Sequence, residues 1–295
     1  MEQEIEKFVA YIAFEKRYSA HTVDAYKSDL EQLRTFLLSD FEIENVNQIN
    51  TAMIRTWLMH LMESGVSARS VNRKITTIKS FYRFLLRQGL CEKNPMLKIT
   101  SPKVPKRLPV FVEGNKMDLL LDHIERDENE FSTCRDKLII ELFYGTGMRL
   151  AELHQLKTSD INYYEKQVRV LGKRNKERII PLVPSLIELI KKYLEQRAIL
   201  NPAHEFVFIL ESGEQAYRGL IYRVVKAALS QISTHEKRSP HVLRHSFATE
   251  MLNRGADLNA IKEILGHANL AATQVYTHNT IEKLKEAYKQ AHPRA

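Results

Sequence analysis

The sequence predicts a mainly α-helical protein with a small antiparallel β-sheet, divided into an N-terminal helical domain and a C-terminal mixed domain. Apolar residues recur at helical spacing through the first hundred positions, a basic segment with several prolines follows, and one strand–turn–strand pattern stands among helices in the second half. We place the helical domain at residues 1–98, the linker at residues 99–110 and the mixed domain at residues 111–295.

Four helices are expected in the first domain. The apolar residues of the first helix fall on one face: Ile5, Phe8, Val9 and Ile12. The second helix begins after Ser19, whose hydroxyl can cap a helix, and the third ends at Gly65. The fourth runs from the candidate cap Ser67 to Gly89, because glycine readily adopts the backbone conformation that ends a helix.

The fourth helix and the linker carry basic residues that we assign to DNA contacts. On the helix, the polar face opposite the apolar one contains Arg69, Arg73 and Thr77, and such a face can lie in the major groove. The linker cannot form a continuous helix because of its prolines, and its cations can follow a polyanion. Its candidate contacts are Lys103, Lys106 and Arg107. A solvated helix face and a solvated spacer are the alternatives.

The composition points to a globular protein with a polyanionic partner. The chain of 295 residues is 44% hydrophobic and 27% charged, and its formal net charge of +8 favours nucleic acid as the partner. No apolar run approaches the roughly 20 residues of a membrane span, and acids stand where a signal peptide needs Lys or Arg. We therefore expect a cytoplasmic protein without a membrane partner. Cys91 and Cys134 have no metal-binding spacing and are expected to be structural.

The second domain should begin with two helices separated by a Gly-Thr-Gly break, within residues 134–161. Residues 166–182 alternate apolar and charged positions around a polar turn and predict a β-hairpin. Residues 183–197 predict an amphipathic helix, and the chain after them is expected to be mostly helical.

Two candidate site residues follow from this organisation. The Gly-Thr-Gly break places Arg149 at a helix N-terminus, where backbone N–H groups and the guanidinium can together bind a phosphate. A surface salt bridge between Arg149 and Glu152 is the alternative. Lys173 lies in the turn of the hairpin, from which an ammonium can reach a DNA groove. A solvated turn is the alternative for Lys173.

The segment from Ser239 to His278 concentrates histidine, arginine and tyrosine. His241 and Arg244 are three residues apart, so on a helix they share a face. A zinc site built from His241, His245 and His267 is the alternative. It is disfavoured because no Glu follows the first histidine, as it would in a metalloprotease, and because Arg244 would be repelled by a dication. We therefore expect no metal.

These residue types suit chemistry at a phosphodiester. Two guanidiniums can neutralise the non-bridging oxygens of a pentacoordinate phosphorus, and a lysine or histidine can protonate the departing oxygen. A tyrosine can attack phosphorus and carry the phosphoryl group covalently. Because a free phenol has a pKa near 10, the attacking oxygen needs cationic neighbours.

Four segments resemble the motif boxes of the tyrosine recombinases, the phage-integrase superfamily: TGMRLAEL, GKRNKERIIPL, HVLRHSFAT and ILGHANLAATQVYTH. The resemblance is closest to the Xer-type enzymes that resolve chromosome dimers. The first domain resembles the SAM-like core-binding domain of this family, and the second resembles its catalytic domain. The resemblance implies six catalytic residues: Arg149, Lys173, His241, Arg244, His267 and, as the nucleophile, Tyr276.

The function implied by the resemblance is site-specific recombination of DNA for chromosome dimer resolution. Tyr276 would form a 3′-phosphotyrosyl intermediate and release a 5′-hydroxyl, and no cofactor, metal or ATP is required. The implied partners are double-stranded DNA, copies of this chain or a paralogous recombinase in a tetramer on two duplexes, and a septal DNA translocase.

Several alternatives remain open at the level of the sequence. An integrase or a DNA invertase of a mobile element would use the same residues, as would a type IB topoisomerase that relaxes supercoils. A site-specific DNA-binding protein without catalysis is the alternative from another functional class.

The C-terminal residues predict a short amphipathic helix with Ile281, Leu284 and Tyr288 on one face. A helix of this length is not stable alone in water, so its apolar face must dock on another surface. The resemblance implies docking on a neighbouring protomer, and packing on its own domain is the alternative.

Overall fold

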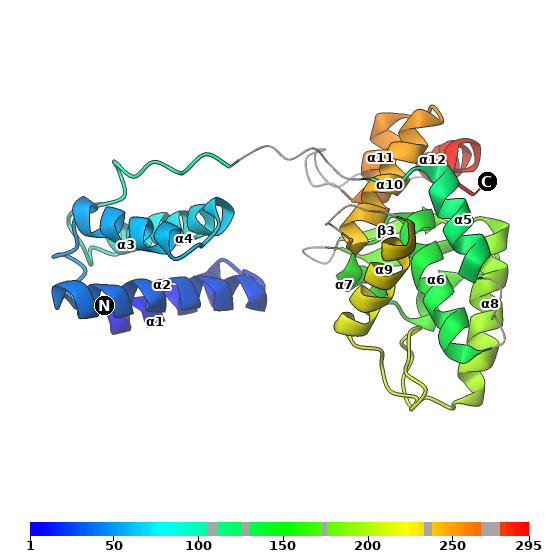
Figure 1. Cartoon of the computed structure of the whole chain (residues 1–295), viewed down its shortest axis with the longest axis horizontal. Helices are drawn as coiled ribbons and strands as arrows, with labels where there is room; N and C mark the ends of the chain where they lie inside the picture. Colours follow the sequence, from blue (N-terminus) through cyan, green and yellow to red (C-terminus); the bar gives the residue numbers. More distant parts are fainter. Residues whose placement is uncertain (105–110, 125–129, 173–175, 233–237, 267–277, 295) are drawn as a thin grey trace. The chain divides into compact units, whose positions relative to one another are not determined.

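The structure is a computed structural model of the chain, and it describes residues 1–104, 111–124, 130–172, 176–232, 238–266 and 278–294. The side chains of residues 122–124 and 278–284 are outside this description. The chain divides into two compact units, Met1–Arg107 and Leu108–Ala295 (Figure 1). None of the described helices is long and apolar enough to cross a membrane.

The described part of the N-terminal unit is helical, and the four predicted helices are confirmed. Its elements are α1 (Glu2–Ala10), the π-helical turn η1 (Tyr11–Glu15), α2 (Ala20–Phe41), α3 (Thr51–Glu63) and α4 (Ala68–Arg87). The hydroxyls of Ser19 and Ser67 accept hydrogen bonds from the backbone N–H groups of Thr22 and Ser70, as predicted for caps.

A buried ionic cluster joins α2 to α4. The carboxylate of Asp29 is fully buried and accepts hydrogen bonds from Arg73, Lys74 and Thr77 at 2.6, 2.8 and 2.9 Å. Lys74 is itself buried and also donates to Gln32. Because each buried charge has a partner, the cluster fixes how α4 lies on α2.

This cluster corrects one of the DNA contacts expected from the sequence. Thr77 is fully buried and donates to Asp29, so its side chain does not belong to the exposed face of α4. Arg69 is exposed. Arg73 is half-exposed, with one guanidinium nitrogen on Asp29.

The first residues of the expected linker pack on the N-terminal unit. Ile99 is buried in its core, and the carbonyl of Pro102 accepts a hydrogen bond of 3.0 Å from the Asn72 amide on α4. The chain therefore stays on this unit as far as residue 102. Lys103 is exposed, while Lys106 and Arg107 lie outside the described residues.

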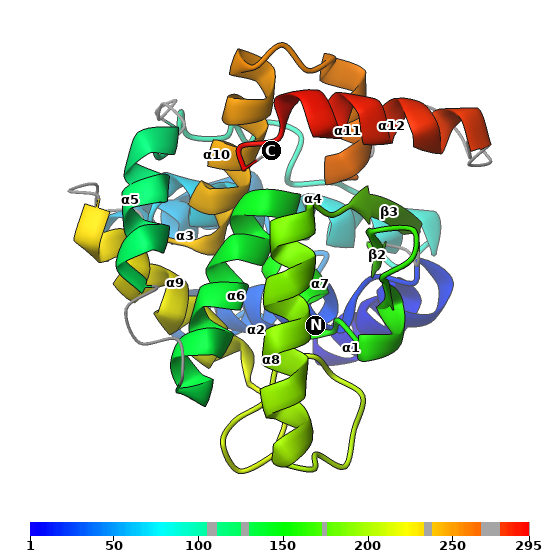
Figure 2. The same ribbon diagram turned by 90° about the vertical axis from the view of Figure 1, so that its right-hand side faces the viewer.

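The C-terminal unit combines helices with a small sheet (Figure 2). Its helices are α5 (Gly114–Ile124), α6 (Phe131–Thr146), α7 (Leu150–His154), η3 (Thr158–Asp160), α8 (Pro184–Ile199), α9 (Arg218–Ile232), α10 (Pro240–Asn253), α11 (Leu258–Leu265) and α12 (His278–Ala291). The strands are β1 (Ile161–Asn162), β2 (Gln167–Leu171) and β3 (Glu177–Pro181), antiparallel in the order β1-β2-β3. The predicted hairpin is confirmed as β2 and β3, with Val168 opposite Ile180.

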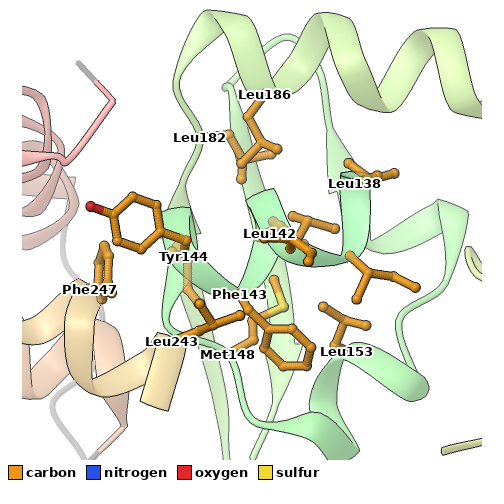
Figure 3. Close-up of a cluster of buried hydrophobic side chains, with 14 of the residues drawn as sticks. Leu138, Leu142, Phe143, Tyr144, Met148, Leu153, Leu182, Leu186, Leu243 and Phe247 are labelled. Carbon is orange, nitrogen blue, oxygen red and sulfur yellow. The ribbon is translucent and has the colours of Figure 1, made fainter. Parts of the chain in front are cut away.

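Helix α6 lies at the centre of this unit. From Cys134 to Thr146, each of its residues except Asp136 is buried. It packs against α8, α9 and α10, and Figure 3 shows Leu186 and Phe247 approaching it from different sides. The end of α6 is thus fixed in the core, which leaves the segment after it little freedom.

We expect Asp29→Ala to destabilise the N-terminal unit by about 3–5 kcal/mol, because it leaves the buried ammonium of Lys74 without its counter-ion. Urea unfolding can be followed by the fluorescence of Trp57, the single tryptophan of the chain, which is buried in this unit. Asp24→Ala, an exposed position on the same helix, is the matched control and should change stability by less than about 0.5 kcal/mol. Equal stability of the two variants would contradict a structural role for the cluster.

Candidate active site

The Gly-Thr-Gly break predicted from the sequence ends α6 and starts α7. Gly147 follows α6 with a φ of +61°, and a Cβ at this position would lie 2.6 Å from Leu265 and 2.7 Å from Phe247. Both the left-handed backbone and the lack of space therefore require glycine here. The turn brings Arg149 to the N-cap position of α7.

Arg149 binds two different parts of the C-terminal unit. Its Nη1 donates to Oε1 of Glu152 at 2.7 Å, and its backbone N–H donates to Oε2 at 2.7 Å. Its Nη2 donates to the carbonyl of Gly266 at 3.0 Å. The salt bridge that the sequence offered as an alternative is thus present, and the side chain is still 27% exposed. An anion in solution can therefore reach the guanidinium.

Arg244 lies nearby on α10 and is buried. Its Nη1 donates to the carbonyl of Gly147, and its Nη2 donates to the carbonyl of Leu265 at 2.6 Å. Burial, followed by the positive charges of Arg149 and Arg178, lowers the pKa of Arg244 to about 10. The side chain remains cationic at neutral pH and is held by two backbone groups.

Arg178 on β3 is a buried member of this group that the sequence reasoning did not single out. Its Nη1 and Nη2 donate to the two oxygens of Glu152 at 2.9 and 2.8 Å, and its Nε donates to the carbonyl of Ile264 at 2.6 Å. Strand alternation was the signal that could have found it, because Arg178 stands two residues before the buried Ile180 and so shares its face.

The three guanidiniums meet at the C-terminal end of α11. Arg178, Arg244 and Arg149 donate to three consecutive carbonyls, those of Ile264, Leu265 and Gly266. The last carbonyls of a helix have no partner within the helix and carry partial negative charge, so cations stabilise them. The next residue in the chain is the candidate His267, which lies outside the described residues.

The charges of this group do not cancel. The described residues that these hydrogen bonds join include three arginines and one carboxylate, that of Glu152. The carboxylate binds Arg149 and Arg178, while Arg244 donates to backbone carbonyls. Burial by itself would raise the pKa of Glu152. The hydrogen bonds and charge of Arg178, and then the bonds from Arg149, outweigh burial and lower this pKa to about 2. The group therefore has an excess of positive charge that suits a phosphate.

The base of the β-hairpin lies against the same group. The backbone N–H of Gly172 donates to the carbonyl of Lys176 at 2.8 Å, which closes the hairpin. A Cβ on Gly172 would lie 3.6 Å from Nη1 of Arg178 and 3.7 Å from Oε1 of Glu152. Lys173 follows Gly172 directly and lies outside the described residues.

Of the remaining candidate residues, the structure describes His241 and His245 and does not describe Tyr276. His241 is exposed near the start of α10, three residues before Arg244 and so on the same side of the helix. His245 is partly buried. Tyr276, like Lys173 and His267, lies outside the described residues.

The C-terminal end of α12 packs on its own unit, and docking of this helix on a neighbouring protomer stays a prediction. Tyr288 is 2% exposed in the core of its own unit, and its hydroxyl donates to the carbonyl of Gly145 at 2.7 Å. His292 is fully buried, its Nε2 lies 2.9 Å from the same carbonyl oxygen, and its ring packs at an angle against the Tyr288 ring. Burial lowers the pKa of His292 to about 4, so the ring is neutral at pH 7. This end of α12 packs on its own unit because its apolar and polar groups both find partners there.

A second surface that the sequence reasoning missed lies on α9 and the residue before it. Its exposed members are Tyr217, Arg218, Tyr222, Arg223 and Lys226. The guanidinium of Arg223 lies over the Tyr217 ring, 5.4 Å from its centroid. Helix α9 packs beside α7, the helix that Arg149 caps.

Comparison with known proteins identifies the family. Residues 111–283 match the Phage integrase family, and residues 5–89 match the family described as Phage integrase, N-terminal SAM-like domain. The chain belongs to the phage integrase family. The tyrosine recombinase XerC of Chlorobaculum parvum is 36% identical over 317 residues, which cover 99% of this chain and 94% of the relative. The tyrosine recombinase XerD of Staphylococcus aureus is 36% identical over 298 residues, which cover 100% of each chain.

The fold is shared with solved recombinase structures. The XerH site-specific recombinase, bound to a palindromic difH substrate after cleavage, matches with a TM-score of 0.73 and 24% identity, over 97% of this chain and 84% of that one. The prediction of a Xer-type tyrosine recombinase is confirmed. The protein is a tyrosine recombinase, an enzyme that cuts and rejoins DNA strands at specific sites.

We expect Glu152→Gln to destabilise the C-terminal unit by about 3 kcal/mol at pH 7. The folded-state pKa of Glu152 is about 2 against an ordinary value of 4.5. A carboxyl whose pKa is depressed by folding stabilises the fold above its unfolded-state pKa and loses that contribution as pH falls. The difference between wild type and variant should therefore be full at pH 6–7 and shrink below about pH 4.5.

Urea unfolding followed by circular dichroism measures this difference, and Trp57 fluorescence reports the N-terminal unit on the same samples. The control is Glu188→Gln, since this side chain is 70% exposed and should show no such dependence. A difference that does not change with pH would mean that the Glu152 charge does not stabilise the fold.

Proposed function

We propose that Arg149 and Arg244 bind the scissile phosphate of the DNA, and that Tyr276 attacks it. The observation that carries the proposal is the excess positive charge where the α6–α7 turn, the end of α11 and the base of the hairpin meet. Each of these segments leads directly to a residue that the motif boxes implied, namely Arg149, His267 and Lys173.

The proposed reaction proceeds by two transfers at phosphorus. The phenol of Tyr276 gives up its proton to a neighbouring base or to water as its oxygen forms a bond to phosphorus. The bond to the 5′-oxygen breaks, and the leaving oxygen takes a proton as it becomes a 5′-hydroxyl. The 3′-phosphotyrosyl bond conserves the energy of the broken bond. A 5′-hydroxyl of a second duplex then attacks the same phosphorus, and the phenol leaves, so that the strands are exchanged.

The arginines stabilise the charge that develops in each transfer. Arg244 is held by the carbonyls of Gly147 and Leu265, so it does not need to reorganise when the phosphorus becomes pentacoordinate. Arg149 is the more exposed of the two and can approach a phosphate oxygen from the protein surface. The proton donor to the leaving oxygen is Lys173 or a histidine, and the exposed His241 can bind the phosphate beside Arg244.

DNA contacts away from the reacting phosphate are expected on both units. In the N-terminal unit they are Arg69, Arg73 and Lys103, joined by Lys106 and Arg107 of the linker. In the C-terminal unit, the exposed face of α9 combines cations with tyrosines, a composition suited to phosphates and base edges. A face that serves only solubility is the alternative for α9.

For the biological role we propose chromosome dimer resolution in the cytoplasm, at the nucleoid. Identity to XerC and XerD proteins along nearly the whole chain supports this role. The proposed assembly is a tetramer on two duplexes, formed with a paralogous recombinase or with copies of this chain, and a septal DNA translocase is the proposed regulator. An integrase or invertase would bind at the ends of a mobile element, so mapping bound sites in the genome decides between these roles.

We expect Tyr276→Phe to bind its DNA site as the wild type does and to form no covalent adduct, because the phenol oxygen alone makes the new bond. The measurement is a denaturing gel of reactions on a nicked duplex that traps the cleaved strand. An adduct formed by the variant would assign the nucleophile to another residue.

Arg149→Ala and Arg244→Ala should each reduce the cleavage rate by about 10²–10³-fold while changing binding much less, since each guanidinium faces charge that grows in the transition state. Single-turnover cleavage and gel-shift titration measure the two effects. Arg169→Ala, at an exposed arginine of β2, is the control and should cleave at nearly the wild-type rate. Cleavage by either test variant at the control rate would exclude that arginine from the reaction.

A further inference from the structure

Arg178 is not one of the six residues that the motif boxes implied, yet it contacts or lies close to each segment of the proposed site. The side chain is 5% exposed, so it does not reach the surface as a DNA-binding cation would. Its hydrogen bonds reach two separate parts of the chain, and it lies close to a third.

The first contact leads to Arg149. Both terminal nitrogens of Arg178 donate to Glu152, a paired geometry that fixes the plane of the carboxylate. The same two oxygens of Glu152 then accept hydrogen bonds from the backbone and the side chain of Arg149. The position of Arg149 is therefore set through Glu152 by Arg178.

The second contact leads to the segment before His267. Nε of Arg178 donates to the carbonyl of Ile264. If a residue with a Cβ replaced Gly266, that Cβ would lie 3.1 Å from Cδ of Arg178. Gly266 has a φ of +65° and ends α11. Arg178 thus supports the turn from which the chain continues to His267.

Arg178 also lies close to the base of the hairpin. Nη1 of Arg178 would lie 3.6 Å from a Cβ on Gly172, the residue before Lys173. Arg178 stands on β3 of this hairpin and pairs with Val170 across the sheet. Its side chain therefore fixes the hairpin relative to α7 and α11.

Arg178 also determines how much positive charge remains for a phosphate. Glu152 is buried, and its negative charge is shared between Arg178 and Arg149. Without Arg178, Arg149 alone would compensate this carboxylate, and its attraction for an anion would fall accordingly.

We propose that Arg178 is a positioning residue for strand cleavage, which holds Arg149 toward the scissile phosphate through Glu152 and fixes the segments that lead to Lys173 and His267. This inference rests on the proposed role of Arg149. A displacement of about 1 Å at a reacting group can reduce a rate about 10²-fold.

The first test compares Arg178→Met and Arg178→Lys in the full-length protein. We expect Arg178→Met to cleave a nicked duplex about 100-fold more slowly, with DNA binding within about threefold of wild type. Arg178→Lys retains the charge but cannot make the paired contact with Glu152, so we expect an intermediate rate. Wild-type cleavage by Arg178→Met would overturn the proposal.

The second test separates positioning from a loss of folded protein. A duplex with a methylphosphonate at the cleavage site carries no negative charge at that phosphorus. Removing an arginine that neutralises the charge of the natural phosphate should therefore reduce the cleavage rate less on this duplex. The cleavage rate of Arg149→Ala, relative to wild type, should therefore fall less on this duplex than on the natural one. The relative cleavage rate of Arg178→Met should also fall less on this duplex, and to the same extent. Tyr193→Phe, which removes buried hydrogen bonds elsewhere in the C-terminal unit, is the control for destabilisation and should show equal effects on both duplexes.

The outcomes distinguish this inference from the function on which it rests. If the cleavage defect of Arg149→Ala is smaller on the neutral duplex and that of Arg178→Met is not, the positioning role of Arg178 is wrong and the proposed role of Arg149 stands. If the cleavage defect of Arg149→Ala is not smaller on the neutral duplex, the proposed role of Arg149 itself fails. Should Arg178→Met not fold, the double variant Glu152→Gln, Arg178→Met leaves no buried charge unpaired and takes its place, with the same results expected.

Discussion

The carboxylate of Glu152 joins the parts of the proposed active site. It accepts hydrogen bonds from the backbone and side chain of Arg149 and from both terminal nitrogens of Arg178, and it is almost fully buried. Through these bonds, one side chain connects α7 to β3, and Arg178 extends the connection to the end of α11. Because an unpaired charge in the interior would be strongly destabilising, these segments must keep their mutual positions in the folded protein.

The same arrangement keeps like charges close together. Arg149, Arg178 and Arg244 would repel one another, and the pKa of Arg244 is lowered first by its burial and then by this repulsion. The carbonyls at the end of α11 offset part of the repulsion, because they carry the negative end of the helix dipole. A bound phosphate would supply the remaining negative charge. The fold thus holds together a cationic group, in which the proposed phosphate would be the missing anion.

The N-terminal unit uses a comparable device on the helix proposed to contact DNA. Asp29 is buried beneath α4 and binds Lys74 and Thr77 from the inside, while Arg73 extends from the same carboxylate toward solvent. In both units, a buried acid orients an arginine that remains accessible. Rigid placement of such arginines reduces the entropy lost when they bind a phosphate.

The sequence by itself determined the elements and the family. Apolar periodicity, the caps at Ser19 and Ser67 and the hairpin pattern depend on neighbouring residues, and the structure has them as predicted. Only the tertiary structure decided the environments of particular polar side chains. The burial of Thr77, the contacts of Arg178 and the packing of Tyr288 on its own unit depend on residues distant in the sequence, such as Asp29, Glu152 and Gly145. Local patterns show which face of an element a residue occupies, but they do not show which partner that face meets.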